Sequence, residues 1–451
     1  MKKSNKILII IGVILLNVLV LYMIGQNLMG KTSEYDEFLA EARNYAKEEL
    51  CSKSIEKYED ALAIKDTLDV CLEMIPVYEK GINNGEFGNV YNIVSTLRYI
   101  IRDYRNDAAA YEEACDFFLR YEKYEECADA LIQARDLNIT SEKIEKLRSD
   151  VRYQYQKNYS MYDTVLPCYD GYYTVSKNGA FLHLDDEASP YSGASYTYLS
   201  SFSEGYAFAK SDYYDGTEKS FIINENEQRQ VYLENVESSS GAGVGKDENG
   251  NQILLLSCKI EDKYTYYNIN GEKAFGEYVF AGRFRNNVAA VMKSEGEWKL
   301  IDGTGEAITD ETFTDVVLNE FDECAPKGII IANNGEGYHL YNHKGEQIGD
   351  FVCDGAKAFV DSYAAFKKGE RWGFVDVEGN VVIDASYDDA KSFSNQMGAV
   401  KNGETWFFIN SDNEITVEET FEDVDYLNSK GICFVKINGY WCNLKFYYTG
   451  K

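Results

Sequence analysis

Residues 363–393 read YAAFKKGERWGFVDVEGNVVIDASYDDAKSF, and this stretch decides the fold of most of the chain. The alternation of apolar and polar residues predicts three short strands, two of which begin at Tyr363 and Trp372. The turn after the second strand runs from Asp376 to Gly379, where glycine takes the positive-φ position. A unit of this size cannot bury its own apolar face, so it must stack against similar neighbours.

The same frame recurs along the chain at intervals of 32 to 45 residues. Each unit carries an aromatic anchor in its central strand: Phe181, Phe221, Tyr266, Trp298, Tyr338, Trp372, Trp406 and Trp441. An Asp or Asn follows four residues later in most units: Asp185, Asn270, Asp302, Asn342, Asp376 and Asn410. A glycine comes seven residues after the anchor in three units: Gly305, Gly345 and Gly379. In the last unit Lys445 stands where the Asp is expected.

A second aromatic closes many of these units, and small residues then begin the next strand. The closing residues are Phe202, Phe284, Phe321, Phe359 and Phe393. With the Trp372-Gly373 pair and the run from Trp298 to Asp302, this pattern resembles the bacterial WG-repeat family. The resemblance covers roughly 280 residues. Proteins of that family are commonly at the surface or secreted, and are mostly of unassigned function, so the resemblance implies a repeat scaffold and no particular reaction.

Residues 165–447 are therefore expected to form an all-β domain of eight units. Closure into a β-propeller would protect the edge strands, and we favour it over the alternative, an open β-solenoid. The anchor aromatics are then expected to be core residues between units and not ligand-binding residues.

Residues 33–157 are predicted to be helical, because apolar residues recur at helical spacing and Pro76 is the single proline. Ala61 and Ala130 lie 69 residues apart, about twice the period of tetratricopeptide repeats, which this segment resembles. The middle unit is degenerate, and its Gly81, Gly85 and Gly88 are expected to mark turns. Such a solenoid would either bind a peptide in its groove or act as a spacer.

The first residues predict the topology. Residues 1–6 carry Lys2, Lys3 and Lys6 and are expected to form a cytoplasmic tail. Residues 7–25 follow as the predicted anchor, in which the uncharged apolar run from Ile7 to Ile24 is about 27 Å long as a helix and long enough to cross a bilayer. No A-x-A cleavage site follows, so we expect a single-pass anchor in the cell membrane, the alternative being a cleaved signal peptide. The remaining domains would then be extracytoplasmic, and the pattern suggests a Gram-positive bacterium.

Charge and cysteine content narrow the classes of partner. The net charge of −30 disfavours nucleic acid, because such a chain repels phosphate backbones. The ten cysteines form no C-x-x-C pair and no zinc-binding spacing. We expect most of them to be small buried apolar residues, with occasional disulfides open if the chain lies outside the membrane.

No catalytic, cofactor-binding or metal-binding motif emerges. The chain holds His183, His339 and His343, with no H-E-x-x-H and no G-x-S-x-G. The glycine-rich run from Gly241 to Lys246 lacks the phosphate-loop spacing, and we interpret it as a flexible loop between strands. The acidic stretch at Asp247 has two possible explanations, turn formation and weak calcium binding, and the sequence fits both equally well.

The leading hypothesis for function is a non-enzymatic binding or scaffolding protein, since both repeat types make extended contact surfaces. Its partner would be a protein or peptide. One alternative is a binder of cell-wall glycan, since exposed Tyr and Trp rings stack on sugars. A third is a hydrolase using paired carboxylates at a propeller channel, which would require buried acids with perturbed pKa values in one pocket.

Overall fold

The computed structural model describes residues 31–88, 90–212 and 216–447. The chain divides into two compact units, one ending at Gln154 and the other beginning at Tyr155. The predicted membrane anchor at residues 7–25 lies outside the described residues. Among the residues that are described, none of the helices has the length and apolar character needed to cross a bilayer.

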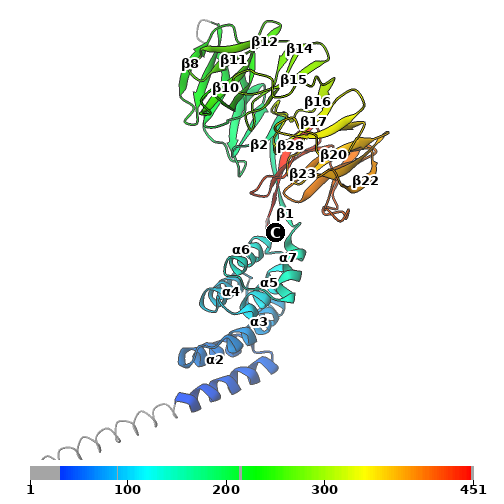
Figure 1. The fold of residues 1–451 in the computed structure, drawn as a ribbon. Coiled ribbons are helices and arrows are strands. Elements are labelled where there is room, and N and C mark those ends of the chain that lie inside the picture. Colours follow the sequence, from blue (N-terminus) through cyan, green and yellow to red (C-terminus); the bar gives the residue numbers. More distant parts are fainter. Residues whose placement is uncertain (1–30, 89, 213–215, 448–451) are drawn as a thin grey trace, which may run out of the picture. The chain divides into compact units, whose positions relative to one another are not determined.

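The first unit is built of helices joined by short turns (Figure 1). Residues 31–47 are helical, and the helices that follow are α2 (Cys51–Ile64), α3 (Leu68–Asn83), α4 (Tyr91–Asp103), α5 (Ala108–Arg120), α6 (Tyr124–Asp136) and α7 (Glu142–Val151). Two helix starts carry side-chain caps: Asp107 accepts from the N–H of Ala109, and Ser141 accepts from the N–H of Ile144.

Small side chains let these helices approach one another. Ala61 in α2 and Ala130 in α6 are both buried, as the tetratricopeptide-like pattern requires. The expectation that Gly81 marks a turn is wrong, because Gly81 lies inside α3. A Cβ there would come within 2.0 Å of the Phe87 ring, so glycine is needed for packing. Gly85, with φ of +83°, does lie in the turn after α3.

The second unit is β-structure, and the strand pairs in its sheets are antiparallel. Over residues 155–212 and 216–447 it contains eight sheets, numbered here in chain order (Figure 1). Sheet 1 comprises β2 (Thr164–Tyr169), β3 (Tyr172–Lys177) and β4 (Ala180–Asp185), and sheet 2 comprises β5 (Tyr198–Leu199), β6 (Tyr206–Asp212), β7 (Glu218–Asn224) and β8 (Arg229–Leu233). Sheet 3 comprises β9 (Ser238–Lys246), β10 (Gln252–Ile260), β11 (Lys263–Asn268) and β12 (Lys273–Tyr278). Sheet 4 comprises β13 (Phe280–Ala281), β14 (Ala289–Ser294) and β15 (Glu297–Ile301).

Sheets 5 to 8 repeat the arrangement. Sheet 5 comprises β16 (Asp315–Val316), β17 (Ile329–Asn333) and β18 (Tyr338–Asn342), and sheet 6 comprises β19 (Gly355–Ala356), β20 (Tyr363–Lys368), β21 (Arg371–Asp376) and β22 (Val381–Tyr387). Sheet 7 comprises β23 (Asp389–Ser394), β24 (Met397–Asn402) and β25 (Thr405–Ile409). Sheet 8 comprises β26 (Asp423–Val424), β27 (Ile432–Ile437) and β28 (Tyr440–Phe446), together with β1 (Tyr155–Tyr162). We call the turn between the first and second strand of a sheet its first turn, and the turn after the third strand its third turn. Both lie at the same end of the sheet.

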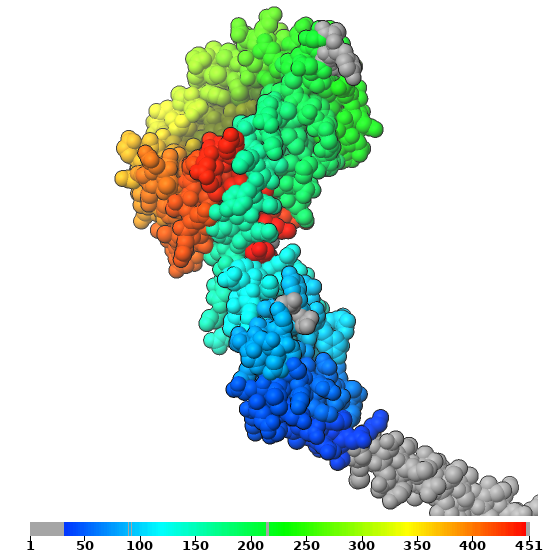
Figure 2. Space-filling model, turned by 180° about the vertical axis from the view of Figure 1, so that it is seen from behind, coloured from blue at the N-terminus to red at the C-terminus, as the bar shows by residue number. Residues whose placement is uncertain are grey.

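The ring of sheets is closed by its two ends. Strand β1 pairs antiparallel with β28 and becomes the fourth strand of sheet 8, with Tyr155 opposite Phe446 and Tyr162 opposite Trp441. The C-terminal and N-terminal strands of this unit accordingly lie side by side in both views (Figures 1 and 2). Sheets 8 and 1 also share a core, and the Tyr173 hydroxyl donates to the carbonyl of Ile432 at 3.1 Å. The unit is a closed propeller-like ring, and the open-solenoid alternative is wrong.

The prediction of a flexible loop from Gly241 to Lys246 is also wrong, because these residues belong to strand β9. Glycine is required there by close packing. A Cβ at Gly243 would lie 2.5 Å from the backbone nitrogen of Phe284 in the next sheet. The backbone N–H of Val244 donates to the Phe284 carbonyl at 3.2 Å.

Candidate functional site: the axial pocket

A pocket of about 340 Å³ opens where the first turns of the sheets converge. Its lining comes from sheets 1, 4, 5, 6 and 8, so it lies on the axis of the ring. The lining includes Cys168, Tyr169, Asp170, Asp186, Arg285, Glu320, Phe321, Glu323, Lys327, Tyr426, Asn428 and Ser429. We call this feature the axial pocket.

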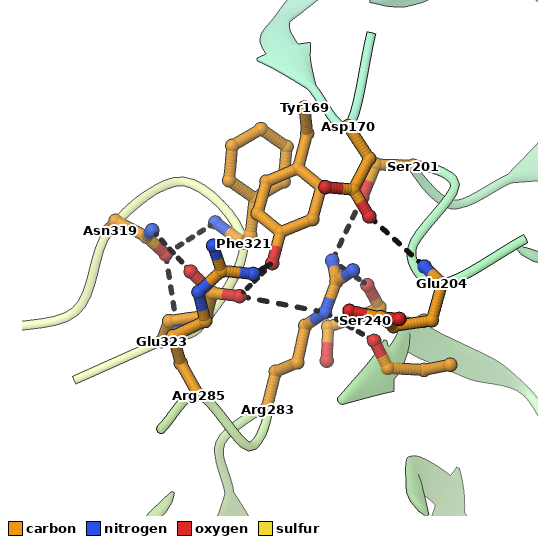
Figure 3. Close-up of polar contacts among 12 residues, drawn as sticks. Tyr169, Asp170, Ser201, Glu204, Ser240, Arg283, Arg285, Asn319, Phe321 and Glu323 are labelled. Atoms are coloured by element: carbon orange, nitrogen blue, oxygen red, sulfur yellow. Dashed lines mark hydrogen bonds and ion pairs between the residues drawn. The ribbon is translucent and has the colours of Figure 1, made fainter. Parts of the chain in front are cut away.

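Tyr169, at the end of β2, reaches across the axis to the opposite side of the ring (Figure 3). Its hydroxyl donates to Glu323 in sheet 5 and accepts from Nη1 of Arg285 in sheet 4 at 2.9 Å. Its ring packs against Phe321, with centroids 4.6 Å apart. One side chain thus joins sheet 1 to sheets 4 and 5, which are remote from it in sequence, and forms part of the wall of the pocket.

Arg283 lies behind this tyrosine and is completely buried. Its Nε donates to the carbonyl of Ala242 at 2.6 Å, and its Nη1 donates to the Ser201 hydroxyl at 2.9 Å (Figure 3). The carboxylate of Glu323, 1% exposed, lies 3.7 Å from Nε, and the guanidinium carbon is 4.3 Å from the centre of the Tyr169 ring. Buried charges persist when they are paired and hydrogen-bonded in this way.

Side chains of opposite charge surround the mouth of the pocket. Asp170 and Glu320 are exposed acids, while Lys327 is an exposed base. The Tyr426 hydroxyl donates to Glu320 at 3.0 Å, and the Asn428 amide donates to the backbone carbonyl of Asp186 at 2.7 Å. These contacts join sheet 8 to sheets 5 and 1.

Burial shifts the ionisation of groups around the axis. Burial, and then the neighbouring Glu323 carboxylate, raise the pKa of Tyr169, although Arg283 opposes this. Burial likewise raises the pKa of Tyr426, helped by Glu320. Both tyrosines are therefore neutral hydrogen-bond donors at physiological pH. Behind Tyr426, burial raises the pKa of the Asp425 carboxyl to about 7, even though Lys391 lowers it.

The sequence-predicted anchors all lie in the third strand of their sheets, remote from the axial pocket. In five sheets the anchor pairs with the residue fifteen positions later: Phe181 with Tyr196, Trp298 with Phe313, Tyr338 with Cys353, Trp372 with Tyr387, and Trp406 with Phe421. In sheet 8 the partner of Trp441 is Tyr162 from β1. In sheets 2 and 3 the anchors pair at other offsets, Phe221 with Tyr232 and Tyr266 with Phe275, so the anchors occupy equivalent places in six of the eight sheets.

Two anchor rings are covered by ammonium groups. The Lys357 nitrogen lies 5.2 Å from the Trp372 ring centre, and the Lys391 nitrogen lies 5.4 Å from that of Trp406. Beside Trp372, Gly373 allows the backbone of β22 to approach, since a Cβ would lie 2.4 Å from the Ile383 carbonyl. The anchors Trp372 and Trp406 and the adjoining Gly373 thus contribute to the packing within and between sheets.

The predicted turn residues build the third turns. Oδ1 of Asp302, Asn342, Asp376 and Asn410 accepts from the N–H groups two and four residues later, at 2.8–3.2 Å. Gly305, Gly345 and Gly379 have φ of +78° to +91° and close these turns. In sheet 3 the expected residue was Asn270, but Asn268 plays this part.

Sequence reasoning did not single out the axial residues Tyr169, Arg283, Arg285 and Glu323. One signal was present. The residue before the closing phenylalanine is Ser201, Ala358 or Ser392 in three units, whereas the charged residues Arg283 and Glu320 stand at this place in sheets 4 and 5. Charged residues at a position that is small in the other three units mark a special environment.

The three histidines do not come together at a site. His183 is buried, and its Nε2 lies 2.9 Å from the Ser200 carbonyl oxygen. His339 lies in β18, and His343 is exposed in the third turn of sheet 5. Across the described parts of the chain, no cluster of three or more His, Cys, Asp or Glu side chains is arranged to hold a metal ion.

Comparison with known proteins supports the repeat assignment. The family model described as WG containing repeat matches residues 340–372, 372–406 and 406–441, so the chain carries WG repeats over this segment. No curated protein matches the chain significantly. Similar solved structures include BamB from Moraxella catarrhalis, with 12% identity and a TM-score of 0.42 over 65% of this chain and 100% of that one. The Cps50 (Swd1) beta-propeller domain of Myceliophteria thermophila has 12% identity and a TM-score of 0.30, over 54% and 93%.

Proposed function

We propose that this WG-repeat chain is a membrane-anchored, extracytoplasmic binding protein, and that a partner protein or peptide docks on the face of the ring that contains the axial pocket. The observation that carries the proposal is the pocket itself. Side chains from five sheets meet there, and Tyr169, Arg283 and Glu323 hold them in place. A preformed concave site with a few fixed polar groups is typical of recognition sites.

The hydrogen bonds of the buried Glu323 carboxylate favour a binding role over hydrolysis. Both oxygens of Glu323 already have donors: Tyr169 on Oε1 and the Asn319 amide on Oε2, at 3.0 Å. Such a carboxylate is not poised to take a proton from water. Asp425, whose pKa is raised to about 7 by burial, does not line the pocket.

A protein partner is favoured over glycan by the state of the tryptophans. Sugar binding commonly uses an exposed indole face. Here Trp406 is 6% exposed, the other three tryptophans are half-buried, and lysine ammonium groups lie over the rings of Trp372 and Trp406. The anchoring is inferred from the apolar run at residues 7–25 and from the lysines before it.

Obstruction of the pocket mouth tests the proposal. Ser429 is an exposed lining residue in the first turn of sheet 8, so Ser429→Trp adds bulk at the mouth without disturbing the core. Ser411→Trp places the same side chain on an exposed third turn outside the pocket. Full-length tagged chains would be expressed in the native membrane and cross-linked to their neighbours.

We expect one partner to be captured by the wild type and by Ser411→Trp, and to be lost from Ser429→Trp. Mass spectrometry of the cross-linked material identifies it. Equal capture by all three chains would contradict docking at the axial pocket.

A further inference from the structure

A second concave feature lies on the same face of the ring, outside the axis. It is a groove of about 880 Å³ formed by the first turns of sheets 3, 4 and 5 and the third turns of sheets 4 and 5. Pro326 and Lys327 line both this groove and the axial pocket, so the two features adjoin. We call it the lysine groove.

The groove has a local charge opposite to that of the whole chain. Lys246, Lys327 and Lys344 line it with exposed side chains, and in the described part of the chain none of them forms an ion pair. The acidic residue in the lining is Asp302, whose Oδ1 is engaged by the N–H groups of Thr304 and Glu306 in its own turn. Three unpaired ammonium groups on a chain with a net charge of −30 are a specific feature of this surface.

Apolar residues line the groove together with the lysines. Val244, Val288, Ile308 and Pro326 contribute to the lining, and all four are buried or half-buried. A surface that recognised phosphate groups alone would not need such a floor. The combination fits a peptide that carries both acidic and apolar side chains.

The groove is also preformed. Oδ1 of Asn287 accepts from the N–H of Lys246 at 2.6 Å and from the N–H of Gly303 at 3.2 Å, which fixes sheet 3 against sheet 4. At Gly303 a Cβ would lie 2.4 Å from the backbone nitrogen of Lys246, so the two backbones are in close contact. A rigid groove loses little conformational entropy on binding.

We propose that the lysine groove binds an acidic segment of the partner protein, with glutamate or aspartate side chains against Lys246, Lys327 and Lys344 and apolar side chains on the floor of the groove. This inference rests on the proposed function in one respect, namely that the partner is a protein. It adds a second contact beside the axial pocket and states the chemistry of the segment that occupies it.

The test uses the full-length chain in detergent and a short fluorescein-labelled peptide of alternating glutamate and leucine. The groove variant combines Lys246→Glu, Lys327→Glu and Lys344→Glu. The control variant combines Lys263→Glu, Lys293→Glu and Lys368→Glu, three exposed lysines near the second turns of sheets 3, 4 and 6, at the other ends of the strands. Both variants change the net charge equally, and circular dichroism checks that each folds. If the groove variant does not fold, Lys→Gln replaces Lys→Glu at all six positions.

We expect the groove variant to bind the peptide at least about tenfold more weakly, with the control variant within about twofold of the wild type at moderate salt. Equal weakening in both variants would show a general charge effect and overturn the proposal. So would equally tight binding of inorganic polyphosphate or of a glutamate–serine peptide, because the apolar floor would then have no role. Ser429→Trp, tested with the same peptide, is expected to bind normally. Loss of partner capture by that variant without loss of peptide binding separates the axial pocket from the groove.

Discussion

At the scale of single residues, the Asp425 carboxyl behaves unlike an ordinary acid. It is buried behind Tyr426, and its Oδ2 has no hydrogen-bond partner. Burial raises its pKa from 3.8 to about 7. Between about pH 4 and pH 7 the folded protein therefore keeps a proton on this carboxyl, whereas the unfolded chain has already lost it. The free energy of unfolding consequently falls as pH rises through this window.

We expect Asp425→Asn to remove that pH dependence, because the amide stays neutral. At pH 8 the variant should be more stable than the wild type, by at most about 4 kcal/mol, and the difference should vanish near pH 4. Urea denaturation across this pH range measures it. Asp350→Asn, at an exposed position, is the control and should leave the pH profile unchanged. A constant difference between wild type and Asp425→Asn at all pH values would contradict the shift.

Arg283 offers a second prediction at this scale. Arg283→Met removes the positive charge beside the buried Glu323 and leaves three hydrogen-bond acceptors without this donor, the Ser201 hydroxyl and the carbonyls of Ala242 and Ser240. We expect a loss of about 3–5 kcal/mol in the free energy of unfolding, the usual cost of an unpaired buried charge. The double variant Arg283→Met/Glu323→Gln should recover part of the loss. Denaturant titration of the three proteins tests this, and equal stability of the single and double variants would contradict the ion pair.

What the sequence could reveal at this scale follows from repetition. Trp298, Trp372 and Asp376 were identifiable because the same residue types return at the same spacing. Tyr169 and Glu323 were not, because each occurs once and their contact joins positions 154 residues apart. A contact between unlike residues on opposite sides of a ring leaves no periodic signal.

At the scale of elements, the third turn is the repeated device of the ring. In sheet 6, Oδ1 of Asp376 accepts from the N–H groups of Glu378 and Asn380 at 3.0 and 2.8 Å. We expect Asp376→Ala to destabilise the chain by about 1–2 kcal/mol, since two N–H groups lose their acceptor. Asp376→Asn keeps the acceptor oxygen, as Asn342 and Asn410 do in neighbouring sheets, and should be nearly neutral. Thermal denaturation distinguishes them, and equal losses would show that charge, not turn geometry, is what matters.

The same device explains where the sequence pattern stops. Lys445 stands where an Asp is expected because β28 has no third turn to make: its neighbour β1 comes from the other end of the unit. The errors at this scale were glycines. Gly81 was predicted to mark a turn and Gly243 to lie in a flexible loop, yet each lies inside an element where a neighbour leaves no room for a Cβ. A glycine in a sequence can be required for either of two reasons, a positive φ angle or a lack of space for a Cβ. Only the packing in the structure shows which reason applies.

At the scale of the whole molecule, closure of the ring depends on the seam between β1 and β28. Tyr162 is 7% exposed and packs 6.0 Å from the Phe434 ring, whereas Tyr159 on the same strand is 71% exposed. We expect Tyr162→Ala to lower the free energy of unfolding by about 3–5 kcal/mol and Tyr159→Ala to change it by about 0.5 kcal/mol or less. Denaturant titration measures both. Similar effects at the two positions would mean that β1 does not complete the core of sheet 8.

The topology of the chain in a membrane is the remaining prediction, and the cysteines make it measurable. Nine of the ten native cysteines are buried, and Cys168, half-buried in the axial pocket, has its pKa raised by burial to about 11. Native thiols should therefore react slowly with a membrane-impermeant maleimide. In the proposed topology the lysines at positions 2, 3 and 6 lie on the cytoplasmic side, so cysteine introduced at the exposed Ser411 should be labelled in intact cells. Cysteine at Ser4 should be labelled only after the membrane is opened. Labelling of Ser4→Cys but not of Ser411→Cys in intact cells would place the ring inside the cell and remove any extracytoplasmic partner.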